Sequence, residues 1–336
     1  MQPEVVIDKS KRIFIERTAT AGSSQIQSAL ESATTLFDPG TISRIEDYLI
    51  FNPEIGVLGL FDGTSEVHTP STGVKKVFEV KSPQSPMKDF HLVGAQGGAL
   101  LARNLLNRLK LEGNADVDLK SLLSKINRAL SEYFKSHTVG DNKNIYGTTP
   151  ASKPAMGGVI ARLNPETECL EIAAWGDVRA AWRTQDGKVN ITDDQLKLHD
   201  AEMYEKIAEI RAKCGDDKSA MWDEFAPFLE VKRNERVNNH QHPKGYCVLN
   251  GDTSFLEAIQ YFEIPIREVS TLVLFTDGMV NRHPAETPDD LAQDVISAFE
   301  QGNISRFLDE TRKREQAASK VSHVAHGEAS FIGLRF

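Results

Sequence analysis

The 336-residue sequence has few cysteines and no long hydrophobic run. Its three cysteines, Cys169, Cys214 and Cys247, are widely spaced and form no CxxC pair. A disulfide framework is therefore not expected, and we expect the protein to reside in a reducing compartment. A membrane-spanning helix would need a run of about 18 apolar residues, and none is present. Residues 1–18 lack the apolar core of a secretory signal. A cytoplasmic protein is therefore expected.

Extreme composition and charge are also lacking. Hydrophobic residues make up 40% of the chain and charged residues 26%, which is typical of a globular protein with a sizeable core. The net charge of −9 argues against a non-specific nucleic-acid binder or a binder of anionic membranes. No linker, internal repeat or heptad pattern divides the chain. We therefore expect one domain over residues 1–336, with residues 1–39 forming an N-terminal strand and helix.

The order of predicted elements indicates the fold class. Strands are predicted at 12–16, 46–51, 55–61, 157–163, 169–175, 178–184, 188–192, 269–276 and 329–336. Helices are predicted at 23–32, 99–111, 117–134, 200–213, 217–230, 288–300 and 303–319. Residues 157–192 read as an antiparallel meander, and the helices come in pairs. This pattern favours an α+β fold in which two antiparallel sheets pack together, with helices on both outer faces in four layers.

Two predicted strands run into an Asp-Gly dipeptide. "VLGLFDGTSE" carries Asp62-Gly63 and "TLVLFTDGMV" carries Asp277-Gly278. Asp-Gly is a common turn signal, and an ordinary turn is one interpretation. Neither dipeptide, however, offers a hairpin partner directly after it. A functional role for both carboxylates is the second interpretation.

Further carboxylates are predicted close to Asp62. Glu46 and Asp47 begin the strand that pairs with residues 55–61, so a short hairpin would bring them near it. Asp177 lies in the turn of "WGDVRAAW". A solvated strand end and a plain turn are the alternatives for these residues. Together the carboxylates would repel one another at a sheet end, and a hard divalent cation such as Mg²⁺ or Mn²⁺ would remove that repulsion.

These stretches, together with the last predicted strand, occur in the order found in a known protein family. "RIEDYLIF…GVLGLFDGTSE", "AAWGDVRAAW…ITDD", "TLVLFTDGMV" and "GEASFIGLRF" resemble the metal-dependent serine/threonine protein phosphatases of type 2C over roughly residues 40–336. "RNERVNNHQHPKGYCVLNGD" is similar to a stretch of certain bacterial members. No single motif is specific, and the resemblance rests on their order and spacing.

The resemblance implies a two-metal hydrolase that uses Mn²⁺ or Mg²⁺ and acts on phosphoprotein substrates. Its metal-site positions correspond here to Glu46, Asp47, Asp62, Gly63, Asp177 and Asp277. Asp62 would bridge two ions, and Asp277 would bind the second. Asp177 matches the position of a third, weaker ion. A metal-activated water would attack the phosphoester, so no protein nucleophile is required.

The sequence departs from the family pattern at several positions. Gly327 stands where the last metal-binding Asp is expected, and Glu328 follows it either as a longer-reaching ligand or as a surface residue. Arg44 is the candidate for the phosphate-binding, catalytic Arg, but it lies nearer the acidic pair than usual and a surface salt bridge is the alternative. Thr64 follows the first Asp-Gly where eukaryotic members often carry a proton-donating His.

Three functions remain open at this point. The first is an active serine/threonine protein phosphatase in which Asp62, Asp277 and Arg44 carry catalysis. The second is a degenerate, catalytically weak or inactive member that binds a phosphoprotein or regulator without turnover, as the missing Asp allows. The third keeps the metal site and changes the substrate to a small phosphoester.

Overall fold

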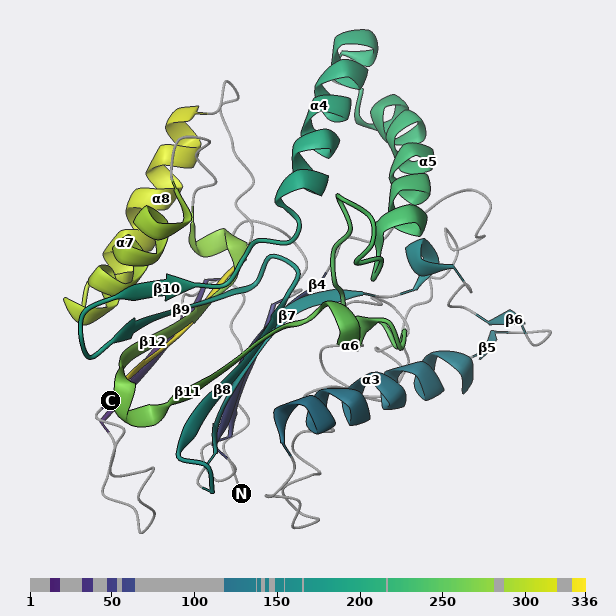
Figure 1. Ribbon diagram of the computed structural model, residues 1–336. Coiled ribbons are helices and arrows are strands. Elements are labelled where there is room, and N and C mark those ends of the chain that lie inside the picture. The colour runs from purple at the N-terminus through teal and green to yellow at the C-terminus, as the bar shows by residue number, and fades with distance from the viewer. Residues whose placement is uncertain are drawn as a thin grey trace, which may run out of the picture.

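Within the residues that it describes, the computed structural model forms two antiparallel β-sheets packed face to face, with helices against both outer faces (Figure 1). The described residues are 13–18, 32–38, 47–52, 56–63, 118–136, 138–139, 143–144, 149–153, 155–164, 166–215, 217–280, 287–318 and 328–336. This is the predicted α+β sandwich. The helices expected at 23–32 and 99–111 lie outside the described residues, apart from Ser32 itself.

One sheet has six strands in the order β1-β2-β13-β12-β9-β10. Their bounds are β1 Ile13–Thr18, β2 Ser32–Asp38, β9 Arg179–Thr184, β10 Val189–Ile191, β12 Val269–Phe275 and β13 Ala329–Arg335. β12 pairs antiparallel with β13 on one side and with β9 on the other. Its residues are almost all buried, because one face meets the other sheet and the opposite face meets helices.

The other sheet has five strands in the order β11-β8-β7-β4-β3. Their bounds are β3 Tyr48–Asn52, β4 Val57–Gly63, β7 Met156–Asn164, β8 Cys169–Trp175 and β11 Gln260–Pro265. All nine residues of β7 are buried, as its position in the middle of the sheet requires. Two short strands, β5 at Thr138–Val139 and β6 at Lys143–Asn144, pair separately.

Helices cover the outer faces of both sheets (Figure 1). α3 (Leu119–Ser136) and α6 (Phe255–Ala258) pack on the five-stranded sheet, and α7 (Pro288–Glu300) and α8 (Ile304–Ala318) cover the six-stranded one. Local sequence explains two helix starts: Asp118 accepts from the Ser121 amide at 2.9 Å, and Thr287 accepts from the Asp290 amide at 3.2 Å. None of the described helices is long and apolar enough to span a bilayer.

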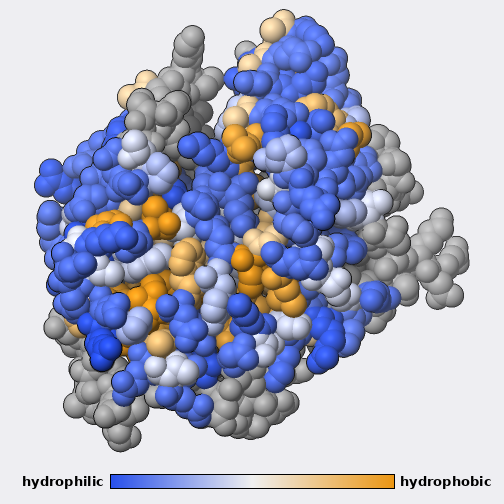
Figure 2. All heavy atoms as spheres, in the orientation of Figure 1, coloured by the Kyte–Doolittle hydropathy of each residue, from blue (hydrophilic) through white to orange (hydrophobic). Residues whose placement is uncertain are grey.

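A helical hairpin stands beyond one end of the sandwich (Figure 1). It consists of α4 (Lys197–Cys214) and α5 (Lys218–Arg236), which lie between β10 and β11 in the order of the chain. On the face shown in Figure 2, hydrophilic residues cover most of this hairpin, and apolar residues show mainly along β11 and α6. Short 3₁₀ turns lie at Pro150–Ser152 (η4), at Ile266–Glu268 (η5), which connects β11 to β12, and at Asp277–Met279 (η6), which follows β12.

The predicted meander over residues 157–192 is wrong in its middle. β7 and β8 pair in the five-stranded sheet, whereas β9 and β10 pair in the six-stranded sheet. The chain therefore crosses between the sheets at Gly176, Asp177 and Val178. A turn signal shows that the chain reverses, but it does not show which sheet the next strand joins.

Two strands of the main sheets were not predicted, nor were the short strands β5 and β6. β2 covers Ser32–Asp38, where the sequence indicated only the end of a helix, and it pairs with β1 and β13. β11 covers Gln260–Pro265 and pairs only with β8, so it forms the sheet edge. Its residues are mostly half-buried, and it therefore lacks the continuous apolar run that marked the central strands.

A buried ion pair anchors α3 to the five-stranded sheet. Arg162 on β7 and Glu171 on β8 are each 3% exposed, and their nearest charged atoms are 3.8 Å apart. Glu171 also accepts hydrogen bonds from the Leu119 amide at the start of α3, at 3.3 Å, and from the Asn164 side chain, at 3.4 Å. The carboxylate therefore satisfies a helix end and a buried guanidinium together.

Replacing Glu171 by Ala is expected to lower the free energy of unfolding by roughly 3–5 kcal/mol, because it leaves Arg162 buried without this partner. Urea unfolding followed by circular dichroism measures the loss. Glu166→Ala is the matched control, since it removes an exposed carboxylate from the same β7–β8 connection, and it should change stability by less than about 0.5 kcal/mol. Equal losses in the two variants would contradict the anchoring role.

Candidate metal centre and adjoining pocket

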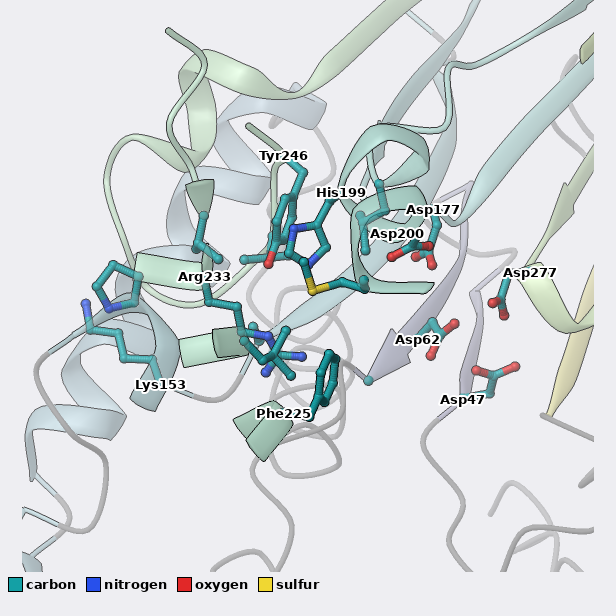
Figure 3. Close-up of a pocket in the computed structure, with 18 of the residues that line it drawn as sticks. Asp47, Asp62, Lys153, Asp177, His199, Asp200, Phe225, Arg233, Tyr246 and Asp277 are labelled. Atoms are coloured by element: carbon teal, nitrogen blue, oxygen red, sulfur yellow. The ribbon is translucent and has the colours of Figure 1, made fainter. Parts of the chain in front are cut away.

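Three aspartates from three separate segments meet at one end of the sandwich. Asp62 lies near the end of β4, Asp177 lies in the crossing between β8 and β9, and Asp277 begins η6 directly after β12. Carboxylate oxygens of the three residues lie within 4.8 Å of one another. Figure 3 shows them on one side of a pocket, with Asp47 beside them. Both Asp-Gly dipeptides thus contribute to one cluster.

Two glycines allow Asp177 to approach β4. Asp62 pairs with Gly157 on β7, and a Cβ on Gly157 would lie only 3.0 Å from Oδ1 of Asp177. Gly176 has a φ of +73°, and a Cβ there would lie 2.9 Å from the Gly157 Cα. Side chains at these two positions would push the crossing away from the sheet. The close approach therefore depends on residues that carry no side chain.

Asp47 and Glu328 form a second, buried part of the acidic cluster. The Asp47 amide donates to Oε2 of Glu328 at 2.6 Å, and Thr276 Oγ1 donates to Oδ2 of Asp47 at 2.9 Å. The Ser330 amide in turn donates to Thr276 Oγ1 at 2.9 Å. These bonds join the residue before β3 to the residue after β12 and to the beginning of β13. Gly278 permits this packing, because a Cβ there would collide with the Glu328 carbonyl oxygen.

Burial and like charge act together on Asp47. Burial raises the pKa of its carboxyl well above the usual range, and the negative charges of Glu328 and then Asp277 raise it further. The hydrogen bond from the Thr276 hydroxyl and the nearby Ser330 hydroxyl lower this pKa in part. Asp47 is only 4% exposed and Glu328 only 8%. Such a site favours a cation, which would offset the repulsion between the carboxylates.

The residues present fit a hard divalent cation. Six carboxylates line the same pocket, together with Gly63: the acidic residues are Asp47, Asp62, Asp177, Asp200, Asp277 and Glu328. Oxygen donors of this kind suit Mg²⁺ or Mn²⁺, which prefer carboxylate, carbonyl and water ligands. The donor set contains no described thiol or imidazole in the three-aspartate cluster, so a softer metal is not favoured.

The predicted site residues divide into two groups. Asp47, Asp62, Gly63, Asp177, Asp277 and Glu328 line one pocket. Arg44, Glu46, Thr64 and Gly327 lie outside the described residues. The surface position considered for Glu328 is wrong, because the residue is buried and accepts from the Asp47 amide. Its role as a metal ligand stays a prediction.

The pocket extends from the acidic cluster beneath the α4–α5 hairpin and has a volume of about 390 Å³. Its far part was not predicted from the sequence. It is lined by residues of the hairpin and of the segments beside it, which include Lys153, His199, Met203, Trp222, Phe225, Leu229, Arg233 and Tyr246. The similarity of residues 233–252 to bacterial phosphatases was the one signal of this region's importance. It did not indicate which side chains face the acidic cluster.

His199 is a neutral hydrogen-bonding residue of the pocket wall. Burial and then the positive charges of Arg236 and Arg233 lower its pKa to about 4. Its Nδ1 lies 3.2 Å from the Arg236 guanidinium, which can only donate. Nδ1 is therefore the acceptor, and the proton of the neutral ring lies on Nε2. The ring packs against Tyr246, with 4.6 Å between ring centroids.

A charged cluster behind His199 fastens the hairpin. Glu202 on α4 accepts from Arg236 at the end of α5 at 2.8 Å, and it also bonds Lys244. Lys232 lies 3.9 Å away from it. The bonds from Lys244 and then Arg236 lower the pKa of Glu202 to about 2. α4, α5 and the following loop are thus held together beside the pocket.

Solved structures share this fold. The sequence itself matches no protein-family model and no curated protein. The serine/threonine phosphatase Stp1 of Staphylococcus aureus is similar with a TM-score of 0.50 and 13% identity, over 91% of this chain and 95% of its own. The phosphatase PstP/Ppp of Mycobacterium tuberculosis has a TM-score of 0.48 and 13% identity, over 90% and 96% of the two chains.

A third similar structure is the serine-threonine phosphatase 2C of Toxoplasma gondii, with a TM-score of 0.48 and 14% identity over 97% of this chain and 99% of its own. At identities this low the likeness concerns the fold. The fold is like that of the serine/threonine phosphatase Stp1, in agreement with the resemblance that the sequence motifs predicted.

His199 should make stability depend on pH. The unfolded imidazole takes up a proton near pH 6.5, whereas the folded one does so only near pH 4. The free energy of unfolding should therefore fall as the pH drops between these values. In His199→Asn this fall should be shallower, by up to about 1.4 kcal/mol per pH unit. Urea unfolding at a series of pH values measures both slopes.

His240 provides the control, because its side chain is 44% exposed and lies away from the pocket lining. His240→Asn should keep the slope of the unsubstituted protein. If His199→Asn keeps that slope as well, His199 is not held neutral in the folded protein.

Proposed function

We propose that this protein is a metal-dependent phosphoester hydrolase that acts on phosphoserine or phosphothreonine in proteins. The observation that supports this most directly is the convergence of Asp62, Asp177 and Asp277 from three separate segments. It occurs at the end of a sandwich whose fold is like that of type 2C phosphatases. The proposal depends on both the acidic site and the fold, because neither observation alone would support a phosphoester hydrolase.

Each carboxylate has a proposed part. Asp62 and Asp277 are proposed to hold two ions of Mn²⁺ or Mg²⁺, with Gly63 contributing through its backbone carbonyl and Asp177 serving a third, weaker ion. Such ions polarise phosphoryl oxygens and lower the pKa of a coordinated water. Asp47 and Glu328 are proposed to add negative charge beside these aspartates. The Thr276 hydroxyl orients Asp47 by donating a hydrogen bond to its carboxylate. Arg44 and Glu46 stay sequence-based predictions for phosphate binding and for the metal site.

The pocket favours a peptide over a compact phosphoester. Its volume of about 390 Å³ is within the usual range for ligand sites. It continues past the acidic cluster along aromatic and cationic side chains of the hairpin, including Phe225 and Arg233. A small phosphoester would occupy only the acidic end. A phosphorylated side chain with its flanking residues would also reach the hairpin.

Asp62→Asn and Asp277→Asn should each lower kcat/KM by more than roughly 100-fold, since loss of even the outer partners of a metal ligand costs 10–100-fold. Hydrolysis of an aryl phosphate and of a phosphothreonine peptide in Mn²⁺ measures the effect. Removing the metal with EDTA should abolish hydrolysis by the unsubstituted protein. Isothermal titration with Mn²⁺ should show weaker binding in both variants.

Asp193→Asn is the matched control, because Asp193 is an exposed carboxylate outside the pocket lining. It should keep full activity and metal affinity. Activity that survives both site substitutions would overturn the proposed mechanism. Mn²⁺ binding without any turnover would instead favour a binding module that lacks activity, which the Gly at position 327 makes the main alternative.

A further inference from the structure

The pocket has two ends of opposite charge. Arg233 and Lys153 lie on one side of Figure 3, and the labelled carboxylates lie on the other: Asp47, Asp62, Asp177, Asp200 and Asp277. Phe225 is seen between the two groups. A metal centre explains the acidic end, but it does not explain a guanidinium and an ammonium in the same pocket. The cationic end calls for a ligand group of its own.

A hydrogen bond joins the two segments that carry Arg233 and Lys153. Lys153 directly follows η4, and Arg233 lies in the last turns of α5. The Ala151 amide of η4 donates to Oδ1 of Asn234, the residue next to Arg233, at 3.0 Å. Both cations are half-buried. Their side chains therefore reach the pocket from backbones that are already joined.

The charge of the Arg233 guanidinium acts on His199 and Tyr246, in the part of the pocket that the hairpin lines. Its charge lowers the pKa of His199 and opposes the burial that raises the pKa of Tyr246, to which it is hydrogen bonded. The charges that raise the pKa of Asp47 are those of Glu328 and Asp277. Arg233 is thus placed to hold a group some distance from the metal centre.

The surroundings of Arg233 strengthen its attraction for an anion. Apolar and aromatic side chains line this part of the pocket: Phe225, Leu229, Val237, Tyr246 and Val248. An ion pair formed among such side chains is screened less than one in open water. A guanidinium presents paired N–H donors that match the two oxygens of a carboxylate or a phosphoryl group. Neutral His199 adds no competing charge at neutral pH.

We propose that Arg233, assisted by Lys153, forms a second anion subsite that binds an acidic group of the phosphopeptide substrate beside the phosphoresidue. That group is a carboxylate or a second phosphoryl group. The subsite rests on the proposed function, because the acidic end of the pocket is taken to hold the scissile phosphoester. It makes the protein selective for phosphoresidues in acidic sequence context. Arg233 is a specificity-determining residue in this assignment.

Binding of non-hydrolysable peptides tests the subsite separately from turnover. Three fluorescein-labelled peptides carry a phosphonate analogue of phosphoserine, flanked by glutamates, by a second phosphonate or by glutamines. Fluorescence polarisation in Mn²⁺ gives their dissociation constants. The unsubstituted protein should bind at least one anionic peptide about tenfold more tightly than the neutral one, as expected for one charge-assisted contact. The two anionic peptides distinguish carboxylate from phosphoryl.

Substitutions at Arg233 assign the preference to this residue. In Arg233→Gln the ratio of dissociation constants should approach one, and Arg233→Lys should keep part of it. Arg233→Glu should reverse it in favour of a fourth peptide flanked by lysines. Arg211→Gln is the matched control, since Arg211 is an exposed arginine on α4 outside the pocket lining. It should keep the full preference, and thermal unfolding checks that each variant is folded.

The outcomes separate this inference from the proposed function. Equal binding of all peptides, no binding of any, or a preference that survives Arg233→Gln overturns the subsite. Hydrolysis of the matching phosphopeptides without an acidic preference overturns the subsite and leaves the phosphatase standing. An Arg233-dependent preference in a protein that hydrolyses none of them upholds the subsite and overturns the phosphatase.

Discussion

Repulsion between carboxylates at one end of the sandwich is the constraint that organises this molecule. Asp47 and Glu328 are almost fully buried, and four more aspartates line the same pocket. Hydrogen bonds from Thr276 and from backbone amides offset part of the cost. The remaining like charge favours a cation at the acidic end.

The two sheets are arranged so that this cluster can form. Asp62 comes from the five-stranded sheet and Asp277 follows a strand of the six-stranded sheet. Asp177 lies where the chain passes from one sheet to the other, and Gly157 and Gly176 leave room for it. Each of these three aspartates thus belongs to a strand end or to the short crossing between strands. This gives the oxygen atoms fixed positions without a flexible loop.

The α4–α5 hairpin gives the pocket a different character beyond the metal centre. Its inner face carries aromatic residues and Arg233, while Glu202, Arg236 and Lys244 tie its base to the loop that follows. His199 stays neutral because it is buried among arginines. The acidic end fits phosphoester chemistry, and the hairpin end fits recognition of what surrounds the phosphate. The two proposed tasks would thus be divided between the sandwich and the hairpin.

Much of the sandwich and half of the site follow from local patterns in the sequence. The central strands β7 and β12 were predicted because both of their faces are buried, and the two Asp-Gly dipeptides marked where β4 and β12 end. β11 was missed because an edge strand is only half-buried, and the meander was wrong because a turn does not specify a sheet. The burial of Glu328 and the direction of Arg233 depend on contacts with residues far away along the chain. Periodicity reports a residue's neighbours within its own element, whereas a pocket is built from side chains that only packing brings together.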